Sequence, residues 1–260
     1  MVKNVGRMPV VFVGHGSPMN AIEDNKYSRK WTELGKSLPR PTAILCVSAH
    51  WYTSGTFVGG QAKPRTIHDF YGFPKELYRI EYPAPGSPDL AKRVLSLISG
   101  IGGEANNDWG LDHGCWSVIR KMYPEADVPI VQLSVNGSKP PSWHFDLAKR
   151  LAPLRDEGIM VLGSGNIVHN LGMVRWDGRD YEWAPVFDKF VQERIEARDY
   201  KSLMFYDSAP GGSLAVPTND HYLPILYPLG LRGKDEPVRF FSQDIVLGSV
   251  SMTGFISGVP

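Results

Sequence analysis

Cysteine is scarce in this sequence: only Cys46 and Cys115 occur among its 260 residues. Two cysteines cannot form the disulfide framework of a small secreted protein, and without a Cys-x-x-Cys pair the usual structural zinc ribbons are excluded. No apolar run is long enough to cross a bilayer, and the N-terminal residues do not follow the pattern of a signal peptide. These absences predict a cytoplasmic protein with reduced thiols and no membrane partner.

Excess charge of either sign is also lacking. The 28 lysines and arginines nearly balance the 27 aspartates and glutamates, so the formal net charge is +1. No basic run occurs that would attract phosphates, and nucleic acid is therefore not an expected partner. The sequence leaves the oligomeric state open.

The hydrophobic pattern alternates between strand-like and helix-like segments. Apolar residues make up 42% of the chain, which is enough for the core of one domain spanning residues 1–260. Short β-branched runs predict buried strands, and segments with helical spacing predict helices between them. Strands are expected at 10–13, 43–50, 128–135, 159–163, 238–241 and 249–256, and helices at about 17–38, 89–99, 143–155, 183–198 and 220–229. This alternation predicts an α/β protein.

Three histidines follow the predicted strands closely. His15 lies between two glycines at the end of the first strand, His50 ends the second, and His169 follows the strand at 159–163 after a short glycine-containing turn. Ligands of open α/β sheets bind at the carboxyl ends of the strands. One such histidine would be read as a satisfied turn residue, but two or more imidazoles at the same rim indicate a metal site.

The other four histidines have different surroundings. His113 lies in a glycine-flanked turn, and His221 stands at the start of a predicted helix. His68 belongs to the aromatic segment 66–74, which is a candidate for a substrate-facing loop and could also form a small local core. His144 lies in the middle of a predicted helix, where we expect a partly exposed residue without a functional role.

Several catalytic motifs are missing. No His-Glu-x-x-His helix and no Gly-x-Ser-x-Gly elbow occurs, so a zinc protease or a serine hydrolase is not favoured. The Gly-Ser-Gly-Asn segment at 163–166 lacks the Gly-Lys-Ser/Thr ending of a phosphate-binding loop. A histidine-rich rim without cysteine ligands suits Zn(II), Fe(II) or a similar divalent ion.

Short motifs along nearly the whole chain resemble the 4,5-DOPA extradiol dioxygenase family, which belongs to the class III extradiol ring-cleavage enzymes. The motifs span 14–20, 48–51, 67–70, 82–88, 111–114, 164–170 and 220–224. The resemblance implies a single three-layer α/β/α domain with a central, largely parallel sheet. It also implies that a catechol such as DOPA and O2 are the small-molecule substrates.

The resemblance assigns roles to the histidines. His15 and His50 match the two metal-binding histidines, and His221 matches the residue that completes the metal site. His169 matches a histidine beside the metal that is either a ligand or an acid/base, and His113 matches one that assists the substrate or O2 as an acid/base. On the substrate side we expect His68 and Phe70.

The sequence does not decide whether the metal is Fe(II) or Zn(II). The better-known class III enzymes use a carboxylate as the third ligand to Fe(II), whereas the matching residue here is His221. An all-histidine site also suits Zn(II), which has no redox chemistry. We therefore expect one divalent ion per chain, Fe(II) for activity or Zn(II) as isolated. A zinc-dependent hydrolase on the same scaffold and a non-catalytic metal- or ligand-binding protein remain alternatives.

Overall fold

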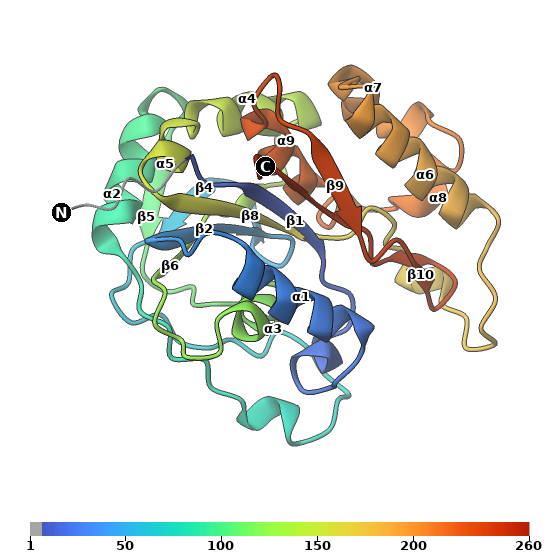
Figure 1. Ribbon diagram of the computed structural model, residues 1–260, viewed down its shortest axis with the longest axis horizontal. Helices are drawn as coiled ribbons and strands as arrows, with labels where there is room; N and C mark the ends of the chain where they lie inside the picture. Colours follow the sequence, from blue (N-terminus) through green and yellow to red (C-terminus); the bar gives the residue numbers. More distant parts are fainter. Residues whose placement is uncertain (1–6, 260) are drawn as a thin grey trace.

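A six-stranded sheet lies at the centre of the protein, as the computed structural model, which describes residues 7–259, shows (Figure 1). Its strands follow the order β6-β2-β8-β1-β12-β9. The first four strands are parallel to one another, and β12 and β9 extend the sheet in antiparallel pairs. The strands are β1 (Val10–Gly14), β2 (Ala43–Ser48), β6 (Ile130–Gln132), β8 (Ile159–Gly165), β9 (Val238–Phe241) and β12 (Gly254–Ser257).

Both faces of the sheet are covered, which explains why its central strands are apolar on both sides. In β1, Val10 and Phe12 pack into one hydrophobic core, whereas Val11 and Val13 pack into the other. The first core receives residues of α2 (Pro88–Leu97), α4 (Pro141–Arg150), α6 (Trp183–Glu196) and α9 (Leu226–Leu231), and the second those of α1 (Lys26–Ser37) and α3 (His113–Met122). The structure thus confirms the expected three-layer α/β/α class with a largely parallel sheet.

The parallel register aligns the carboxyl ends of three strands. Gly14 of β1 pairs with Gly165 of β8, and Ser48 of β2 pairs with Ser164 of β8. The backbone N–H of His15 donates to the carbonyl of Gly165, which extends the ladder by one residue. The segments that leave β1, β2 and β8 therefore start at one edge of the sheet.

Shorter elements surround this core. The remaining helices are α5 (Pro153–Asp156), α7 (Tyr200–Met204) and α8 (Gly212–Ala215). Three two-stranded pairs join β3 (Tyr52–Thr53) to β7 (Val135–Asn136), β4 (Thr56–Gly59) to β5 (Gly103–Asn106), and β10 (Ile245–Val246) to β11 (Val250–Ser251). Turns of 3₁₀ helix occupy Pro18–Ala21, Leu77–Arg79, Ser99–Ile101, Leu171–Met173, Tyr206–Ser208 and Leu223–Ile225.

The predicted helix at 17–38 is wrong at its start. Pro18–Ala21 forms only a 3₁₀ turn, and α1 begins at Lys26 because Asn25 caps it. The Asn25 side chain accepts hydrogen bonds from the backbone N–H groups of Tyr27 and Ser28, and the Ser28 hydroxyl accepts one from the Asn25 N–H. Such reciprocal capping satisfies N–H groups that the first helical turn leaves free, so it sets where the helix begins.

Four other predicted elements are interrupted. The helix expected at 143–155 ends at Arg150, and Pro153 starts a separate short helix because proline cannot donate the hydrogen bond that would continue the first one. The strand expected at 128–135 divides into β6, which lies in the main sheet, and β7, which pairs with β3. The helix expected at 220–229 is a 3₁₀ turn followed by α9, and the segment 249–256 divides between β11 and β12.

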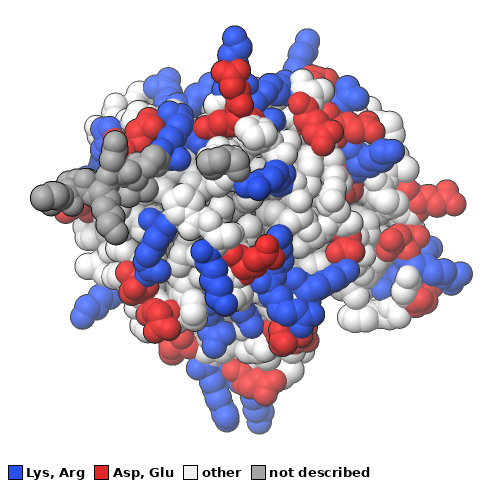
Figure 2. All heavy atoms as spheres, in the orientation of Figure 1, with Lys and Arg blue, Asp and Glu red and all other residues white. Residues whose placement is uncertain are grey.

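The surface visible in Figure 2 carries lysine and arginine side chains interspersed with aspartate and glutamate, without a broad area of one sign. Between residues 7 and 259, no helix has the length and apolar character that a bilayer crossing requires.

One buried arginine connects three segments of the fold. The Arg155 side chain has no exposed surface; it donates to the carbonyls of Met8 and Leu231 at 2.6 and 2.7 Å and pairs with both carboxylate oxygens of Glu236. It thereby joins the start of β1, the end of α9 and the loop before β9. A buried ionic group is expensive to break because the partner that remains has lost its solvation without compensation.

We expect Arg155→Met to lower the free energy of unfolding by about 3 kcal/mol, since it leaves two carbonyls and Glu236 without their partner. The matched control is Arg93→Met, because Arg93 forms a bidentate pair with Glu157 whose side chains are 43% and 38% exposed. That surface pair contributes about 1 kcal/mol or less. Urea denaturation of the metal-free proteins measures both values, and equal losses in the two variants would contradict the prediction.

Candidate active site

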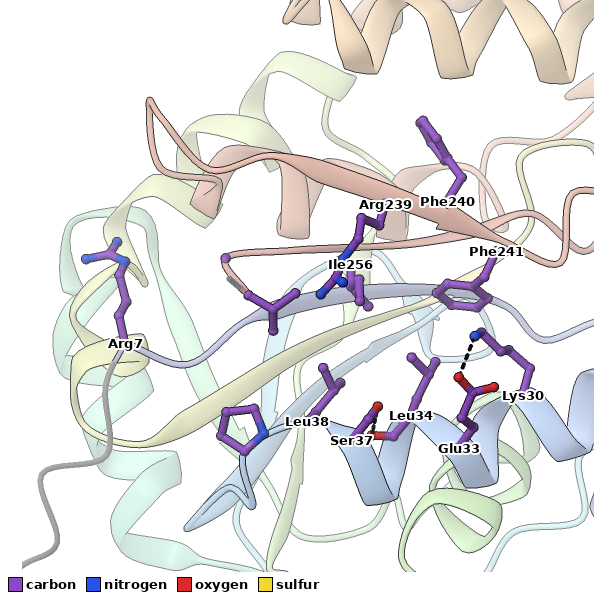
Figure 3. A pocket seen from close by; sticks show the side chains of 13 residues that line it. Arg7, Lys30, Glu33, Leu34, Ser37, Leu38, Arg239, Phe240, Phe241 and Ile256 are labelled. Carbon is purple, nitrogen blue, oxygen red and sulfur yellow. Dashed lines mark hydrogen bonds and ion pairs between the residues drawn. The ribbon is translucent and has the colours of Figure 1, made fainter.

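Five histidines line one cavity at the carboxyl edge of the sheet. The cavity has a volume of about 490 Å³ and brings together His15, His50, His113, His169 and His221. A larger hollow of about 950 Å³ lies between α1 and β9 at another part of the molecule (Figure 3), but it is lined by none of these residues. The sequence pattern therefore predicted correctly that the strand-end histidines meet.

The hydrogen bonds of His15 determine which ring nitrogen is available. Its Nδ1 lies 3.0 Å from the Ser164 hydroxyl oxygen, and that hydroxyl donates its own proton to the Gly114 carbonyl at 2.6 Å. The Ser164 oxygen can therefore only accept from His15, which places the proton on Nδ1. The lone pair of Nε2 remains free to bind a cation.

His50 and His221 are oriented in the same way by carboxylates. Nδ1 of His50 lies 3.1 Å from Asp69 Oδ2, and Nδ1 of His221 contacts Asp220 Oδ2. A carboxylate beside Nδ1 favours the proton on that nitrogen and leaves Nε2 as the ligand atom. All three imidazoles thus have the arrangement that metal-binding histidines have in proteins.

The free nitrogens of these three residues converge. Ligand nitrogens of His15, His50 and His221 all lie within 4.8 Å of one another, and the two Nε2 atoms of His15 and His50 are 3.1 Å apart. Two lone pairs at this distance repel each other unless a proton or a cation lies between them. The residues therefore fit a divalent metal ion, which could be held by one nitrogen from each.

Burial disfavours the protonated form of each of these imidazoles. Burial first, and then the other histidines of the cluster, hold the pKa of His15 well below its ordinary value. Burial also lowers the pKa of His221 to about 4, although Asp220 opposes the shift. For His50 burial acts in the same direction, but Asp69 and the charge of Asp112 raise its pKa overall. Neutral imidazoles are the form that binds a metal.

His169 lies directly beside the three converging histidines. Its ring stacks on that of His221, with centroids 3.5 Å apart and planes 8° from parallel. Its backbone N–H donates to the Ala215 carbonyl, which fixes the loop after β8. Burial, followed by the charge of His221, lowers the pKa of His169 to about 2. The imidazole is a neutral base next to the candidate metal position.

His113 is positioned by two aspartates. Asp112 caps α3 and is fully buried; its carboxylate accepts from the Ser48 hydroxyl and from the Gln132 side chain. Asp69 accepts from the His113 backbone N–H at 2.8 Å, and its Oδ2 lies 3.1 Å from His113 Nδ1. Oδ2 of Asp69 is also 3.1 Å from Nδ1 of His50, so one carboxylate oxygen lies beside both imidazoles.

The two aspartates were not predicted in these positions. In the sequence, Asp69 is one residue of an aromatic loop and suggests a contact to the substrate, whereas the structure points it toward His50 and His113. The signal that could have found it is its place beside His68 and Phe70 in the motif 67–70, because carboxylates that orient metal ligands often come from loops near the site.

The expected role of His68 at the substrate is not supported. Phe70 lines the cavity, but His68 does not: its Nε2 bonds to the Ile80 carbonyl, and its ring packs edge-on against Phe70. His68 therefore packs against the loop on the side that faces away from the cavity. His144 also differs from expectation, since it is completely buried and contacts the Tyr227 hydroxyl and the Asn136 carbonyl.

The glycine at the end of β8 allows His221 to reach the site. A Cβ at Gly165 would overlap the backbone carbonyl oxygen of His221, and that carbonyl accepts a hydrogen bond from the Asn166 N–H at 2.9 Å. Only a residue without a side chain lets the two backbones approach this closely.

The chain matches the family described as the catalytic LigB subunit of aromatic ring-opening dioxygenase over residues 9–251. It is 50% identical to the 4,5-DOPA dioxygenase extradiol of Escherichia coli (strain K12), with 95% of this chain and 93% of that protein aligned. It is 39% identical to the protein of the same name from Beta vulgaris, over 86% of this chain and 87% of that protein.

A solved structure has the same fold as this chain. The crystal structure of an uncharacterized protein from Escherichia coli K12 covers 97% of this chain and 100% of its own, with a TM-score of 0.86 and 46% identity. The fold and the histidine cluster thus define a class of metal-dependent, ring-opening dioxygenases. The chain belongs to the LigB family of aromatic ring-opening dioxygenases, and it is an extradiol ring-cleaving enzyme.

We expect Gly165→Ala to weaken metal binding about tenfold or more, as the loss of an orienting partner does, because the new methyl group displaces the backbone of His221. Titration of Zn(II) into the metal-free protein against a chromophoric chelator measures the affinity. Gly100→Ala is the matched control, since a Cβ there meets no atom closer than 3.5 Å. Unchanged affinity in Gly165→Ala would show that His221 does not depend on this close approach.

Proposed function

We propose that the chain opens the ring of a catechol such as DOPA with O2, using Fe(II) held by His15, His50 and His221. The observation that carries the proposal is the convergence of three imidazole nitrogens on one point of a largely apolar cavity. The curated relatives named 4,5-DOPA dioxygenase extradiol support the substrate class. The metal would supply a common binding point for the catechol oxygens and O2 and a path for electrons between them.

The three imidazole ligands suit two metals, of which only one supports ring opening. Three imidazoles suit Fe(II) and Zn(II), and Zn(II) binds such sites more tightly, so we propose that Zn(II) is found in the protein as isolated. Zn(II) cannot exchange electrons with O2, and ring opening therefore requires Fe(II). His169, which stacks on His221, is either a fourth ligand or an acid/base.

His113 and His169 are the proposed acid/base residues. Asp69 favours the proton of His113 on Nδ1, so Nε2 can take a proton from a catechol hydroxyl. Burial, followed by the charge of His50, lowers the pKa of His113, which keeps the ring neutral and able to accept at neutral pH. His169 is neutral for the same reason and can exchange a second proton.

Phe70 offers an apolar face for the catechol ring. It lines the cavity, its ring lies edge-on to His113 with centroids 5.5 Å apart, and it packs against Phe73 and Tyr78. An aromatic side chain held by its neighbours can contact a flat substrate without reorganising. We propose that this contact holds the ring while the hydroxyls meet the histidines.

The remaining expectations concern the whole chain. We propose that residues 1–260 form one catalytic domain, which the family match over residues 9–251 supports. We also propose a cytoplasmic location, which fits the free thiols of Cys46 and Cys115, both buried in the core.

Metal-free protein reconstituted anaerobically with Fe(II) should consume O2 when DOPA is added in air and should form a coloured, ring-opened semialdehyde. The Zn(II)-loaded protein should do neither, because Zn(II) has no accessible redox change. An oxygen electrode and the absorption spectrum of the product measure both reactions. Absence of O2 uptake by the Fe(II) form with a panel of catechols would overturn the proposal.

The roles of ligand and acid/base can be separated by two variants. His15→Ala should lose the metal, whereas His113→Ala should retain it and lose activity by about 10²–10⁴-fold, the usual contribution of a general acid/base. Metal content after reconstitution and kcat with DOPA give the two readouts. If His113→Ala reacted like the parent protein, His113 would have only a structural role.

A further inference from the structure

The mouth of the catalytic cavity is made of apolar side chains that are unusually exposed. Tyr71, Leu171 and Trp176 line the same cavity as the histidines, and they are 91%, 62% and 86% exposed. They come from two separate loops, at 66–74 and at 171–181. Exposed apolar rings that gather around the opening of a cavity, and not across a flat face, indicate a surface that a ligand covers.

The loop that carries Trp176 is fixed along its backbone. Hydrogen bonds run from the N–H groups of Asn170, Arg175 and Tyr181 to the carbonyls of Ser249, Leu247 and Gly248, at 3.0, 2.8 and 3.0 Å. The Arg175 guanidinium lies 3.5 Å from the centre of the Tyr181 ring, so it is already engaged. Trp176 directly follows Arg175, whose N–H forms one of these hydrogen bonds. The backbone of Trp176 is therefore held beside the cavity, although its ring is exposed.

Leu247 belongs to the same cavity wall, and its backbone has a conformation that is unfavourable for leucine. It lies in the turn between β10 and β11 with φ of 51°, a left-handed conformation that is unfavourable for leucine. Leu247 nevertheless lines the cavity, together with Val246 and Val250. Gly248 has a positive φ of 73° as well, so the two residues form a tight turn that holds Leu247 at the wall of the cavity.

The cavity offers no cationic lysine or arginine to a carboxylate substituent. Among its described lining residues there is no lysine or arginine, and the single carboxylate, Asp69, lies between His50 and His113. A carboxylate that entered this region would lose part of its water without gaining an ion pair. An apolar group would instead remove the exposed rings and its own surface from water.

We propose that Trp176, Leu247 and Tyr71 form a subsite for the ring substituent of the catechol, and that this subsite selects neutral, apolar substituents over zwitterionic ones. The inference rests on the proposed function, because it takes the two hydroxyls to lie at the histidine end of the cavity. DOPA then reacts, but less efficiently than a catechol whose substituent is an alkyl group.

The test compares catechol, 4-methylcatechol, 4-tert-butylcatechol and DOPA. The value of kcat/KM of the Fe(II)-loaded protein should rise with the apolar size of the substituent and should be about tenfold or more higher for 4-tert-butylcatechol than for DOPA. Calorimetric Kd values on the Zn(II)-loaded protein, which does not turn over, should follow the same order.

Substitutions of the subsite residues test whether these residues produce the preference for apolar substituents. Trp176→Ala should lower the ratio of kcat/KM for 4-tert-butylcatechol to that for catechol about tenfold, and Trp176→Phe should restore most of it. Leu247→Asn should lower the same ratio while the midpoint of unfolding stays constant or rises, because asparagine tolerates the left-handed conformation. Phe205→Ala is the control, since Phe205 is 58% exposed but lies outside the cavity and should leave the ratio as it is.

A preference for DOPA over 4-tert-butylcatechol would overturn the inference, and so would an equal loss for all four compounds in Trp176→Ala. The proposed function fails in a distinguishable way. No O2 uptake with any catechol, together with Kd values that still follow apolar size on the Zn(II) protein, would count against ring cleavage and in favour of the subsite.

Discussion

The site depends on the parallel register of β1, β8 and β2. This register places Gly14, Gly165 and Ser48 at one edge of the sheet, and the next residues of the chain deliver His15 and His50 to the same point. A shift of one residue in either pairing would point the alternating side chains to the opposite faces and would separate the two imidazoles. Close packing in both cores opposes such a shift, since every side chain of the shifted strand would leave the neighbours that its shape fits.

Electrostatic compensation is the second requirement of this arrangement. Burial holds the pKa of His15 and of His221 below the ordinary value and keeps both rings neutral, while Asp69, Asp112 and Asp220 lie immediately behind the cluster. His113 and His50, in turn, hold the pKa of Asp69 well below its ordinary value although burial acts against this shift. The lowered pKa values of Asp69 and Asp220 keep these two carboxylates ionised, so they make the centre attractive to a cation and favour one orientation of the rings beside them.

The features that the sequence predicts correctly are those that depend on short-range patterns. Apolar runs locate β1, β2 and β8, and because such strands end at a common edge, the histidines after them could be grouped from the order of residues alone. The role of Asp69, the position of His68 behind Phe70 and the burial of His144 depend on contacts between segments far apart in the chain. Likewise, β7 leaves the main sheet because it pairs with β3, which no local pattern in 128–135 reveals.

The wide spacing of the three histidines along the chain has a consequence for how the protein matures. His15 and His50 belong to its first fifth, whereas His221 comes late in the sequence and is placed against Gly165 by the C-terminal part of the fold. A growing polypeptide on the ribosome therefore holds at most two of these nitrogens until most of the chain has been synthesised. With the proposed ligands, a complete metal site exists only after translation and folding, so the finished protein would choose between iron and zinc from the ions around it.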